Sequence, residues 1–305
     1  YEYMGPAWYQ REIEIPAAWK GKRIFLYFER THWLSSVYVG KEEVSKIDYI
    51  SIPHNHELTQ WLHPGKKELI TFCIDNRYQY DTHKWDHAHS EFTQINWNGV
   101  LGEIKLVAVD PVYVDDMQVY PDIKNKSIKV KMTVRNCTEH TASGKISFHV
   151  SGKDYRLQKE VPVTVTDSIT YIEEEMFLSK DIHLWNEFHP NLYTLDCKLT
   201  SSVEGQSYAH EKSTTFGMRE VEAGEDHIIL NGEPIHLRGT VENAVFPKTG
   251  YAPVDDASWE RVLRILKEYG MNHMRFHSWC PPAAAFRMAD KLGVYLEIGR
   301  ASCRE

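Results

Sequence analysis

Ser127-Ile-Lys-Val-Lys-Met-Thr-Val134 alternates apolar and polar side chains with a period of two residues. Lys145-Ile-Ser-Phe-His-Val150 repeats this pattern a short distance further along the chain. Because neighbouring side chains of a β-strand point to opposite faces, each segment should bury one face and expose the other to water. Residues 110–217 are therefore predicted to form an immunoglobulin-like β-sandwich.

The chain before this region has the same all-β character. Arg23-Ile-Phe-Leu-Tyr-Phe-Glu29, Ser36-Val-Tyr-Val39 and Glu68-Leu-Ile-Thr-Phe-Cys-Ile74 are short runs rich in β-branched and aromatic residues. Turn signals such as Pro64-Gly65 separate them. Several short strands at close spacing predict a second sandwich or a jelly roll over residues 1–109.

The chain after about residue 217 changes character, because helical patterns appear between apolar strands. We predict strands and helices, in chain order, at Pro234–Gly239, Ala257–Tyr269, Met271–Phe276, Pro281–Leu292 and Val294–Leu296. Trp259, Leu263 and Leu266 share one stripe of the first helix, and Asp255 or Asp256 can cap its start. Strand, helix, strand, helix, strand is the opening of a parallel α/β unit.

Composition narrows the function classes. The chain has 305 residues, of which 42% are hydrophobic, and a net charge of -8, which disfavours binding to nucleic acid or to an anionic membrane. No apolar run reaches the length of about 18 residues that a transmembrane helix needs. The five cysteines are too scattered for a metal motif or a dense disulfide framework.

Several motifs carry a resemblance to a known family. They lie, in order, at Pro6–Arg11, Trp19–Arg23, Asn96–Ile104, Leu184–Tyr193, Phe216–Arg219 and Ile229–Gly239. Together they resemble glycoside hydrolase family 2, the group of the β-galactosidases and β-glucuronidases. The resemblance implies a sugar-binding jelly roll at 1–109, an immunoglobulin-like β-sandwich at 110–217 and the truncated start of a (β/α)8 TIM barrel at 218–296.

The resemblance also implies an activity. Family members are retaining glycosidases with two catalytic carboxylates, so the parent protein is expected to be an exo-β-glycosidase that hydrolyses terminal β-linked sugars. Both family glutamates come from later barrel strands. No residue of this chain, including Glu242 and Glu297, is therefore assigned a catalytic role. The chain by itself is predicted to be inactive. A non-catalytic carbohydrate-binding protein of the same architecture is the alternative.

The expected partners follow from this function. The substrate is an oligosaccharide or glycoside, and neither a cofactor nor a metal, nucleic acid or membrane is expected. The sequence leaves the oligomeric state and the compartment open, and a periplasmic or extracellular location is compatible with relatives that degrade polysaccharides.

Met274–Pro282 resembles the family's second-strand signature, in which an arginine and a histidine lie close to the substrate. Arg275 matches the arginine, whereas His277 is displaced by one position from the commoner order. We predict both as substrate-binding residues. The alternatives are a salt bridge for Arg275 and a packed or solvated histidine for His277.

Gly239–Asn243 occupies the place of a first-strand loop that often carries a histidine in the family. Glu242 and Asn243 stand there instead, and we predict that they contact substrate. A solvated loop charge is the alternative for Glu242.

The segment Asp86–Glu91 contains His87 and His89 among acidic residues. Two histidines without a fixed third ligand are weak evidence for a metal. We favour a loop that leads into Asn96-Trp-Asn98 and packs toward the barrel mouth, with Asn96 contacting substrate.

Residues 297–305 resemble an in-frame translation of a common sequencing adapter. We predict that this tail, with Cys303, is not native and that the native sequence stops near Leu296. An unusual but real loop is the alternative.

Overall fold

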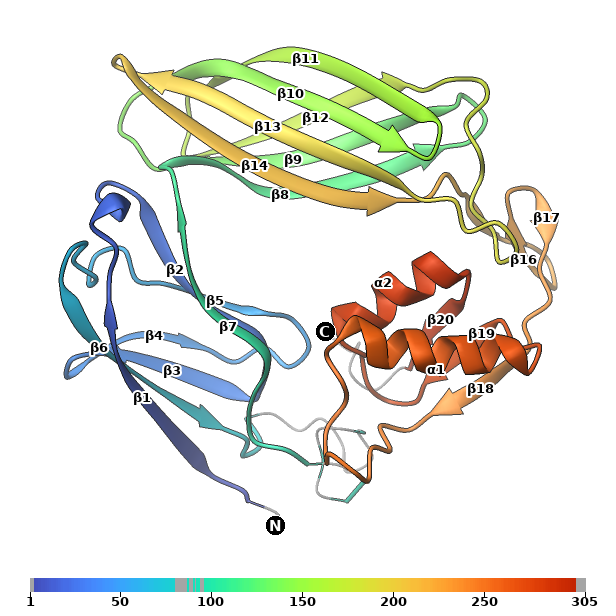
Figure 1. Ribbon diagram of the computed structural model, residues 1–305, viewed down its shortest axis with the longest axis horizontal. Helices are drawn as coiled ribbons and strands as arrows, with labels where there is room; N and C mark the ends of the chain where they lie inside the picture. Colours follow the sequence, from blue (N-terminus) through green and yellow to red (C-terminus); the bar gives the residue numbers. More distant parts are fainter. Residues whose placement is uncertain (1–2, 80–86, 88–89, 91, 94–95, 300–305) are drawn as a thin grey trace. The chain divides into compact units, whose positions relative to one another are not determined.

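A computed structural model describes residues 3–79, 87, 90, 92–93 and 96–299 of the chain. Contacts within the chain divide it into two compact units. The first unit contains residues 1–108 and 237–305, and the second contains residues 109–236. Figure 1 labels the elements of both, which are mostly β-strands.

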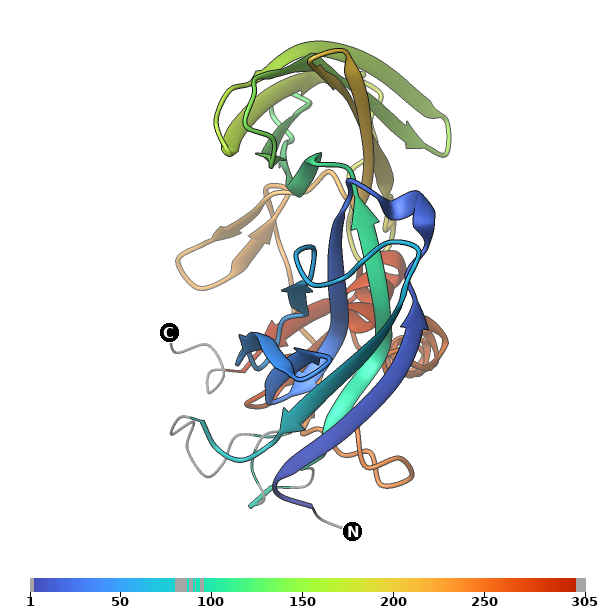
Figure 2. The same cartoon turned by 90° about the vertical axis from the view of Figure 1, so that its left-hand side faces the viewer.

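The N-terminal part of the first unit is a sandwich of two sheets. One sheet has the order β1 (Pro6–Glu14), β6 (Lys67–Asp75), β3 (Leu34–Val39), β4 (Glu42–Ile47). The other has the order β5 (His54–Glu57), β2 (Arg23–His32), β7 (Gly99–Val109), and a 3-10 turn lies at Ala17–Trp19. Figure 2 shows β1 running antiparallel beside β6. The three predicted strands of this region are confirmed as β2, β3 and β6.

The core of this sandwich lies between its sheets, as the alternating sequences require. Phe28 of β2 and Ile74 of β6 come from different sheets, and both are completely buried. Along β2, buried and half-buried positions alternate from Arg23 to Phe28. The period of two in the sequence therefore appears directly in the burial of the strand.

The second unit is also a two-sheet sandwich. One sheet has the order β11 (Tyr155–Val165), β10 (Ala142–Gly152), β13 (Tyr193–Val203), β14 (Gln206–Phe216). The other has the order β12 (Ile169–Phe177), β9 (Ser127–Asn136), β8 (Val112–Asp122). A small sheet follows, made of β15 (Val221–Ala223), β16 (Ile228–Leu230) and β17 (Glu233–Pro234). The alternating segments that predicted strands are confirmed as β9 and β10.

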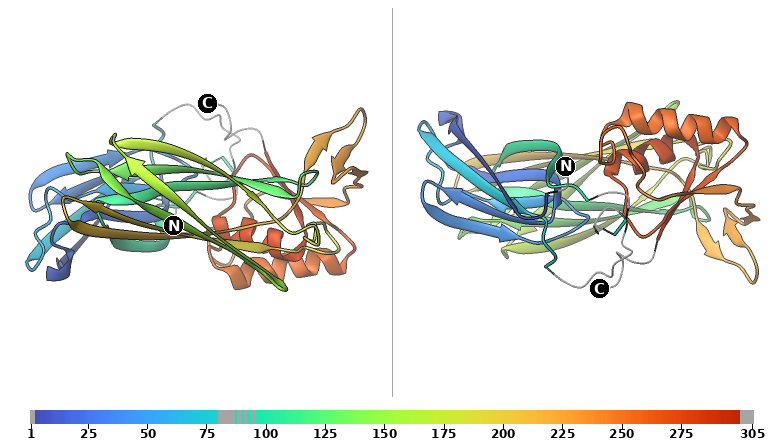
Figure 3. Two further views of the ribbon diagram at one scale, coloured as in Figure 1. Left: turned by 90° about the horizontal axis from the view of Figure 1, so that it is seen from above. Right: turned by 90° about the horizontal axis from the view of Figure 1, so that it is seen from below.

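The C-terminal part of the first unit is a parallel α/β segment. Its sheet has the order β18 (Gly239–Glu242), β19 (His273–Phe276), β20 (Tyr295–Ile298), and all pairs are parallel. Helices α1 (Asp256–Glu268) and α2 (Ala283–Leu292) cover one face of this sheet, as both views of Figure 3 show. The two predicted helices are confirmed within one or two residues at each end.

The predicted strand at Pro234–Gly239 is wrong in its position. Parallel pairing begins only at Gly239, which is opposite His273. A Cβ at Gly239 would lie 2.4 Å from Nδ1 of His273, so glycine allows the two strands to approach at this point. Before it, the backbone N–H of Arg238 donates to the Asn272 side chain at 2.7 Å instead of joining a ladder.

In the described part of the chain, no helix is both long enough and apolar enough to span a membrane. The predicted non-native tail is described only in part: Glu297 and Ile298 lie in β20 and Gly299 follows, whereas residues 300–305 lie outside the described residues.

Candidate functional site

The candidate site lies at the carboxyl ends of the three parallel strands. Pairing across the sheet places Val241, Arg275 and Glu297 in one row. The next residue along each strand is the last residue of that strand. Met274 and Phe276 are buried in the core shared with α1 and α2. Because side chains alternate along a strand, Arg275 points to the opposite face of the sheet. The fold therefore brings residues from three separate segments to one edge.

Glu242, the last residue of β18, is a mostly buried carboxylate. It accepts hydrogen bonds from the backbone N–H groups of Ala244 at 2.9 Å and Val245 at 3.1 Å. Burial raises the pKa of Glu242, and these backbone hydrogen bonds oppose that shift. The alternative of a solvated loop charge is therefore wrong, because this carboxylate holds the turn after β18.

The backbone beyond two of these strands is strained. Ala244, after β18, has φ +55°, and Ser278, after β19, has φ +58°. Residues other than glycine rarely adopt this left-handed conformation, and its cost is of order 1 kcal/mol. The bond from Ala244 N–H to Glu242 helps to hold the first of these turns. Such strain clusters at functional sites, which supports a functional reading of this edge.

Asn243, between Glu242 and Ala244, contributes a buried side-chain oxygen. Its Oδ1 atom has no hydrogen-bond donor among the described residues. A buried acceptor without a donor costs free energy, so this atom is suited to receive a hydroxyl from a ligand.

Arg275 takes part in an ion-pair cluster on the exposed face of the sheet. Its Nε lies 3.0 Å from one oxygen of Glu297, and Nε2 of His273 lies 3.4 Å from the other. Burial lowers the pKa of His273, which Glu297 opposes. The salt-bridge alternative for Arg275 is thus observed. The Arg275 side chain is still 42% exposed, so the same guanidinium can also donate to a ligand.

His277 follows β19 and meets His87 from the N-terminal part of the first unit. Their Nδ1 atoms lie 3.3 Å apart, and the hydroxyl of Ser278 lies 3.0 Å from Nδ1 of His277. Two ring nitrogens at this distance form a hydrogen bond only if one is protonated and the other is not. Burial, and then the neighbouring His277, lowers the pKa of His87. The packed alternative for His277 is therefore observed, with its partner on a distant segment.

The loop predicted at residues 86–91 is described only at His87 and Ser90, of which His87 contacts His277. Asp86, His89 and Glu91 themselves lie outside the described residues. Among the residues that the structure describes, no group of three or more His, Cys, Asp or Glu side chains is arranged to hold a metal ion.

Asn96 lies elsewhere. Its side-chain amide donates to the sulfur of Met4 at 2.8 Å, and its oxygen accepts from Asn76 at 3.4 Å. These described contacts anchor Asn96 within the N-terminal sandwich. The structure therefore brings Glu242, Asn243, Arg275 and His277 to the strand ends but does not show Asn96 in contact with them.

Sequence reasoning missed two residues of this site. His87 was predicted to lie in a loop that packs toward the barrel mouth but was not named as a site residue, and nothing in the local sequence indicates its contact with His277, which is 190 residues away. Trp279 is 1% exposed, and its indole N–H donates to the backbone carbonyl of Glu242 at 3.3 Å. Trp279 belongs to the same motif as Arg275 and follows His277 by two residues. Its place in this motif could have indicated that it belongs to the site.

Comparison with known proteins gives matches along nearly the whole chain. The family model for glycosyl hydrolases family 2 matches residues 112–219. A β-galactosidase of Thermoanaerobacter pseudethanolicus is 23% identical over 296 residues, which cover 96% of this chain and 39% of that protein. A putative β-glucuronidase of Formosa agariphila is 25% identical over 305 residues, which cover 96% of this chain and 27% of that protein. The chain thus spans well under half the length of these two relatives.

Solved structures share the fold. A glycosyl hydrolase family 2 member from Bacteroides cellulosilyticus has a TM-score of 0.79 at 20% identity, over 97% of this chain and 40% of that one. Bacteroides uniformis β-glucuronidase 2, solved covalently bound to cyclophellitol-6-carboxylate aziridine, has a TM-score of 0.80 at 19% identity, over 97% of this chain and 36% of that one.

Proposed function

The chain belongs to glycoside hydrolase family 2, and from this membership we propose that it is part of a retaining exo-β-glycosidase that hydrolyses terminal β-linked sugars. The substrate is an oligosaccharide or a glycoside. The names of the relatives, β-galactosidase and β-glucuronidase, support this reaction class.

We further propose the domain organisation that accompanies this function. Residues 1–109 form a sugar-binding jelly roll, residues 110–217 an immunoglobulin-like sandwich, and residues 218–296 the start of a (β/α)8 barrel. Two two-sheet sandwiches followed by parallel strands that alternate with helices support this assignment.

The observation that carries the proposal is the shared edge of β18, β19 and β20. Barrel enzymes build their active sites at the carboxyl ends of their strands. Here that edge carries a half-exposed guanidinium at Arg275, a buried oxygen at Asn243 and an imidazole at His277. Guanidinium and imidazole N–H groups donate to sugar hydroxyls, and amide and carboxylate oxygens accept from them. We assign these residues, with Glu242, to the floor of the sugar site, and Asn96 to a contribution from the N-terminal domain.

The reacting carboxylates are not assigned within this chain. A retaining glycosidase needs two carboxyl groups about 5 Å apart, one free to attack and one to exchange a proton. The Glu242 carboxylate is held by two backbone N–H groups, and Glu297 is shared between Arg275 and His273. Both have structural partners, so we expect the 305 residues by themselves to release no aryl alcohol from any aryl β-glycoside.

The test begins with the gene. Long-read sequencing across the codons of Glu297 and Ile298 shows whether residues 297–305 are native, and it supplies the remaining reading frame. The complete protein is then assayed on 4-nitrophenyl β-galactoside, β-glucuronide and β-mannoside. Turnover of at least one supports the proposal. Sugar binding without turnover of any would leave the carbohydrate-binding alternative.

A matched pair of variants then tests the site. Arg275→Ala in the complete protein should lower kcat/KM by roughly 10- to 100-fold, the loss expected for one charged hydrogen bond. Arg264→Ala removes an exposed arginine that pairs with Glu260 on α1, and it should leave kcat/KM unchanged. Equal activity of the two variants would remove Arg275 from the sugar site.

A further inference from the structure

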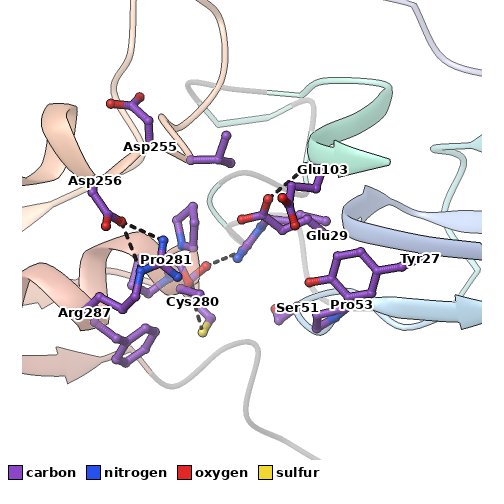
Figure 4. A pocket seen from close by; sticks show the side chains of 15 residues that line it. Tyr27, Glu29, Ser51, Pro53, Glu103, Asp255, Asp256, Cys280, Pro281 and Arg287 are labelled. Carbon is purple, nitrogen blue, oxygen red and sulfur yellow. Dashed lines mark hydrogen bonds and ion pairs between the residues drawn. The ribbon is translucent and has the colours of Figure 1, made fainter. Parts of the chain in front are cut away.

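A cavity in the first unit is lined by residues other than those assigned to the strand-end site. It has a volume of about 550 Å³, within the range of small-molecule sites. Figure 4 shows its wall. Tyr27, Glu29 and Glu103 come from strands of the N-terminal sandwich, whereas Asp256 is the first residue of α1 and Arg287 lies within α2.

Two aromatic rings contribute apolar surface to this wall. Tyr27 lies on β2, with the ammonium group of Lys105 at 4.9 Å from its ring centre. Phe286, in the first turn of α2, is 38% exposed and lines the cavity. Burial, and then the charge of Glu29, raises the pKa of Tyr27, so its hydroxyl keeps its proton at neutral pH. The wall therefore offers apolar faces together with a hydroxyl that donates and accepts.

A fixed ion pair supplies donors and acceptors side by side. The guanidinium of Arg287 donates to one oxygen of Asp256 from Nε at 3.1 Å and from Nη2 at 2.6 Å. The two side chains are 52% and 48% exposed, so each keeps polar atoms in reach of a ligand. Neighbouring hydroxyls of a sugar ring match such a pair, because one can donate to the carboxylate while the other accepts from the guanidinium.

Arg30 provides an independent indication that the cavity receives a polar ligand. This residue lines the cavity and is only 6% exposed. Its described hydrogen bond runs from Nη2 to the backbone carbonyl of Cys280. Burial lowers the pKa of Arg30, and the nearby charges of Cys280 and Glu29 oppose that shift. A guanidinium has five N–H donors, so Arg30 keeps donors beyond this bond that can be offered to a ligand. The oxygens of a ligand in the cavity would accept from them.

The charge of the wall decides which oxygen-rich ligand fits. Four carboxylates line the cavity, at Glu29, Glu103, Asp255 and Asp256, against two guanidinium groups. An anionic ligand would meet more negative than positive charge, whereas a neutral polyhydroxylated ligand would not.

We propose that this cavity is a second carbohydrate site, which binds one unit of a neutral oligosaccharide through the rings of Tyr27 and Phe286, the Asp256–Arg287 pair and Arg30. Its lining residues differ from those assigned to the strand-end site, and binding there requires no hydrolysis. Its role is to retain a polymeric or branched substrate while a chain end is processed elsewhere.

The experiment uses the 305-residue chain and saturation-transfer NMR with lactose, cellobiose and mannobiose as probes, followed by calorimetry on whichever binds. We expect at least one neutral disaccharide to bind. Phe286→Ala and Arg287→Ala should each weaken its binding by about tenfold or more, in line with the loss of an aromatic contact or a charged hydrogen bond. Circular dichroism checks that both variants fold, which the exposure of the two side chains favours.

Two controls locate the binding. Phe188→Ala removes an equally large and more exposed ring from the second unit, and Arg264→Ala removes an exposed arginine of α1 that does not line the cavity. Neither should change affinity for the probe. Absence of binding by every probe, or loss of binding in Arg275→Ala with retention in Phe286→Ala, would overturn the inference.

The same results separate this inference from the proposed hydrolysis. A complete protein that binds the disaccharide through Phe286 but turns over no aryl glycoside would refute only the hydrolysis. An active protein whose binding is indifferent to Phe286 and Arg287 would refute only the second site.

Discussion

Lowering the pH from about 7.5 to about 5 should destabilise the N-terminal sandwich, because two histidines are buried in its core and burial disfavours their charged forms. His54 and His56 on β5 both have no exposed surface. Burial, and then the neighbouring His54, lowers the pKa of His56 to about 3. Burial likewise lowers the pKa of His54.

Hydrogen bonds define the neutral state of this pair. Nε2 of His54 lies 2.8 Å from the Tyr49 carbonyl, so it carries the proton, and Nδ1 accepts from the Ser35 hydroxyl at 2.6 Å. The Ser35 oxygen then accepts from Nε2 of His56 at 2.8 Å. Nδ1 of His56 accepts from the hydroxyl of Ser45, also at 2.8 Å. Each ring therefore has both nitrogens bonded while it is neutral.

The magnitude follows from the pKa of His56. The unfolded chain takes up a proton below the ordinary histidine pKa of about 6.5, whereas the folded chain does so only near 3. The stabilisation is thus fully present above about pH 6.5 and is lost as the pH falls toward 3. At about pH 5 this amounts to roughly 2 kcal/mol from His56 alone.

The assay is hydrogen exchange of peptides covering β3 and β5, converted to a free energy of opening and corrected for the pH dependence of intrinsic exchange. His56→Gln keeps a donor for Ser35 but cannot titrate, so its free energy of opening should fall by about 2 kcal/mol less than that of the original chain between these pH values. His63→Gln changes an exposed histidine of the same sandwich, so its free energy of opening should fall between these pH values by as much as that of the original chain. Parallel pH profiles for the original chain and His56→Gln would refute the reasoning.

Three further predictions concern stability, each measured by urea unfolding followed with circular dichroism. Phe148→Ala, at a side chain 2% exposed in the core of the second unit, should lower the free energy of unfolding by about 3–5 kcal/mol, and a loss under about 1 kcal/mol would contradict the packing. Gly144→Ala should lower the free energy of unfolding by about 1–3 kcal/mol, because the new Cβ would lie 2.0 Å from the carbonyl oxygen of Thr200 on the paired strand. An unchanged urea midpoint would show that β10 and β13 can separate freely. Asp255→Ala should cost about 1 kcal/mol through loss of the cap that accepts the Ser258 N–H at 2.8 Å, whereas Asp255→Asn should retain most of it.

Local patterns in the sequence determined most of the secondary structure. The alternation at Ser127–Val134 predicts a half-buried strand, and β9 has that burial pattern. The stripe of Trp259, Leu263 and Leu266 predicts the buried face of α1, and Asp255 caps this helix as one of the two expected residues. These features succeed because they depend on residues within one or two turns of each other.

The start of β18 shows where local patterns fail. Pro234–Gly239 is apolar enough to suggest a strand, but pairing begins only at Gly239, where the close approach of His273 becomes possible. The partner strand lies more than thirty residues away, and its register is not encoded in the segment itself.

The site residues divide in the same way. The sequence alone supplied Arg275, His277, Glu242 and Asn243 as members of two motifs. Only the tertiary structure decided their chemical state: it pairs Arg275 with Glu297, buries the Glu242 carboxylate and raises its pKa. Burial and charge partners are properties of the packed chain, so no spacing in the sequence predicts them.

Two further features depend on the packing of segments that are far apart in the sequence. They are the contact between His87 and His277 and the cavity around Arg30. The paired residues are 190 positions apart in the first case and 250 in the contact of Arg30 with Cys280. The sequence determined which side chains are available and which strands and helices carry them. Tertiary structure decided which of them meet, because a contact between distant segments depends on how the intervening chain folds and packs.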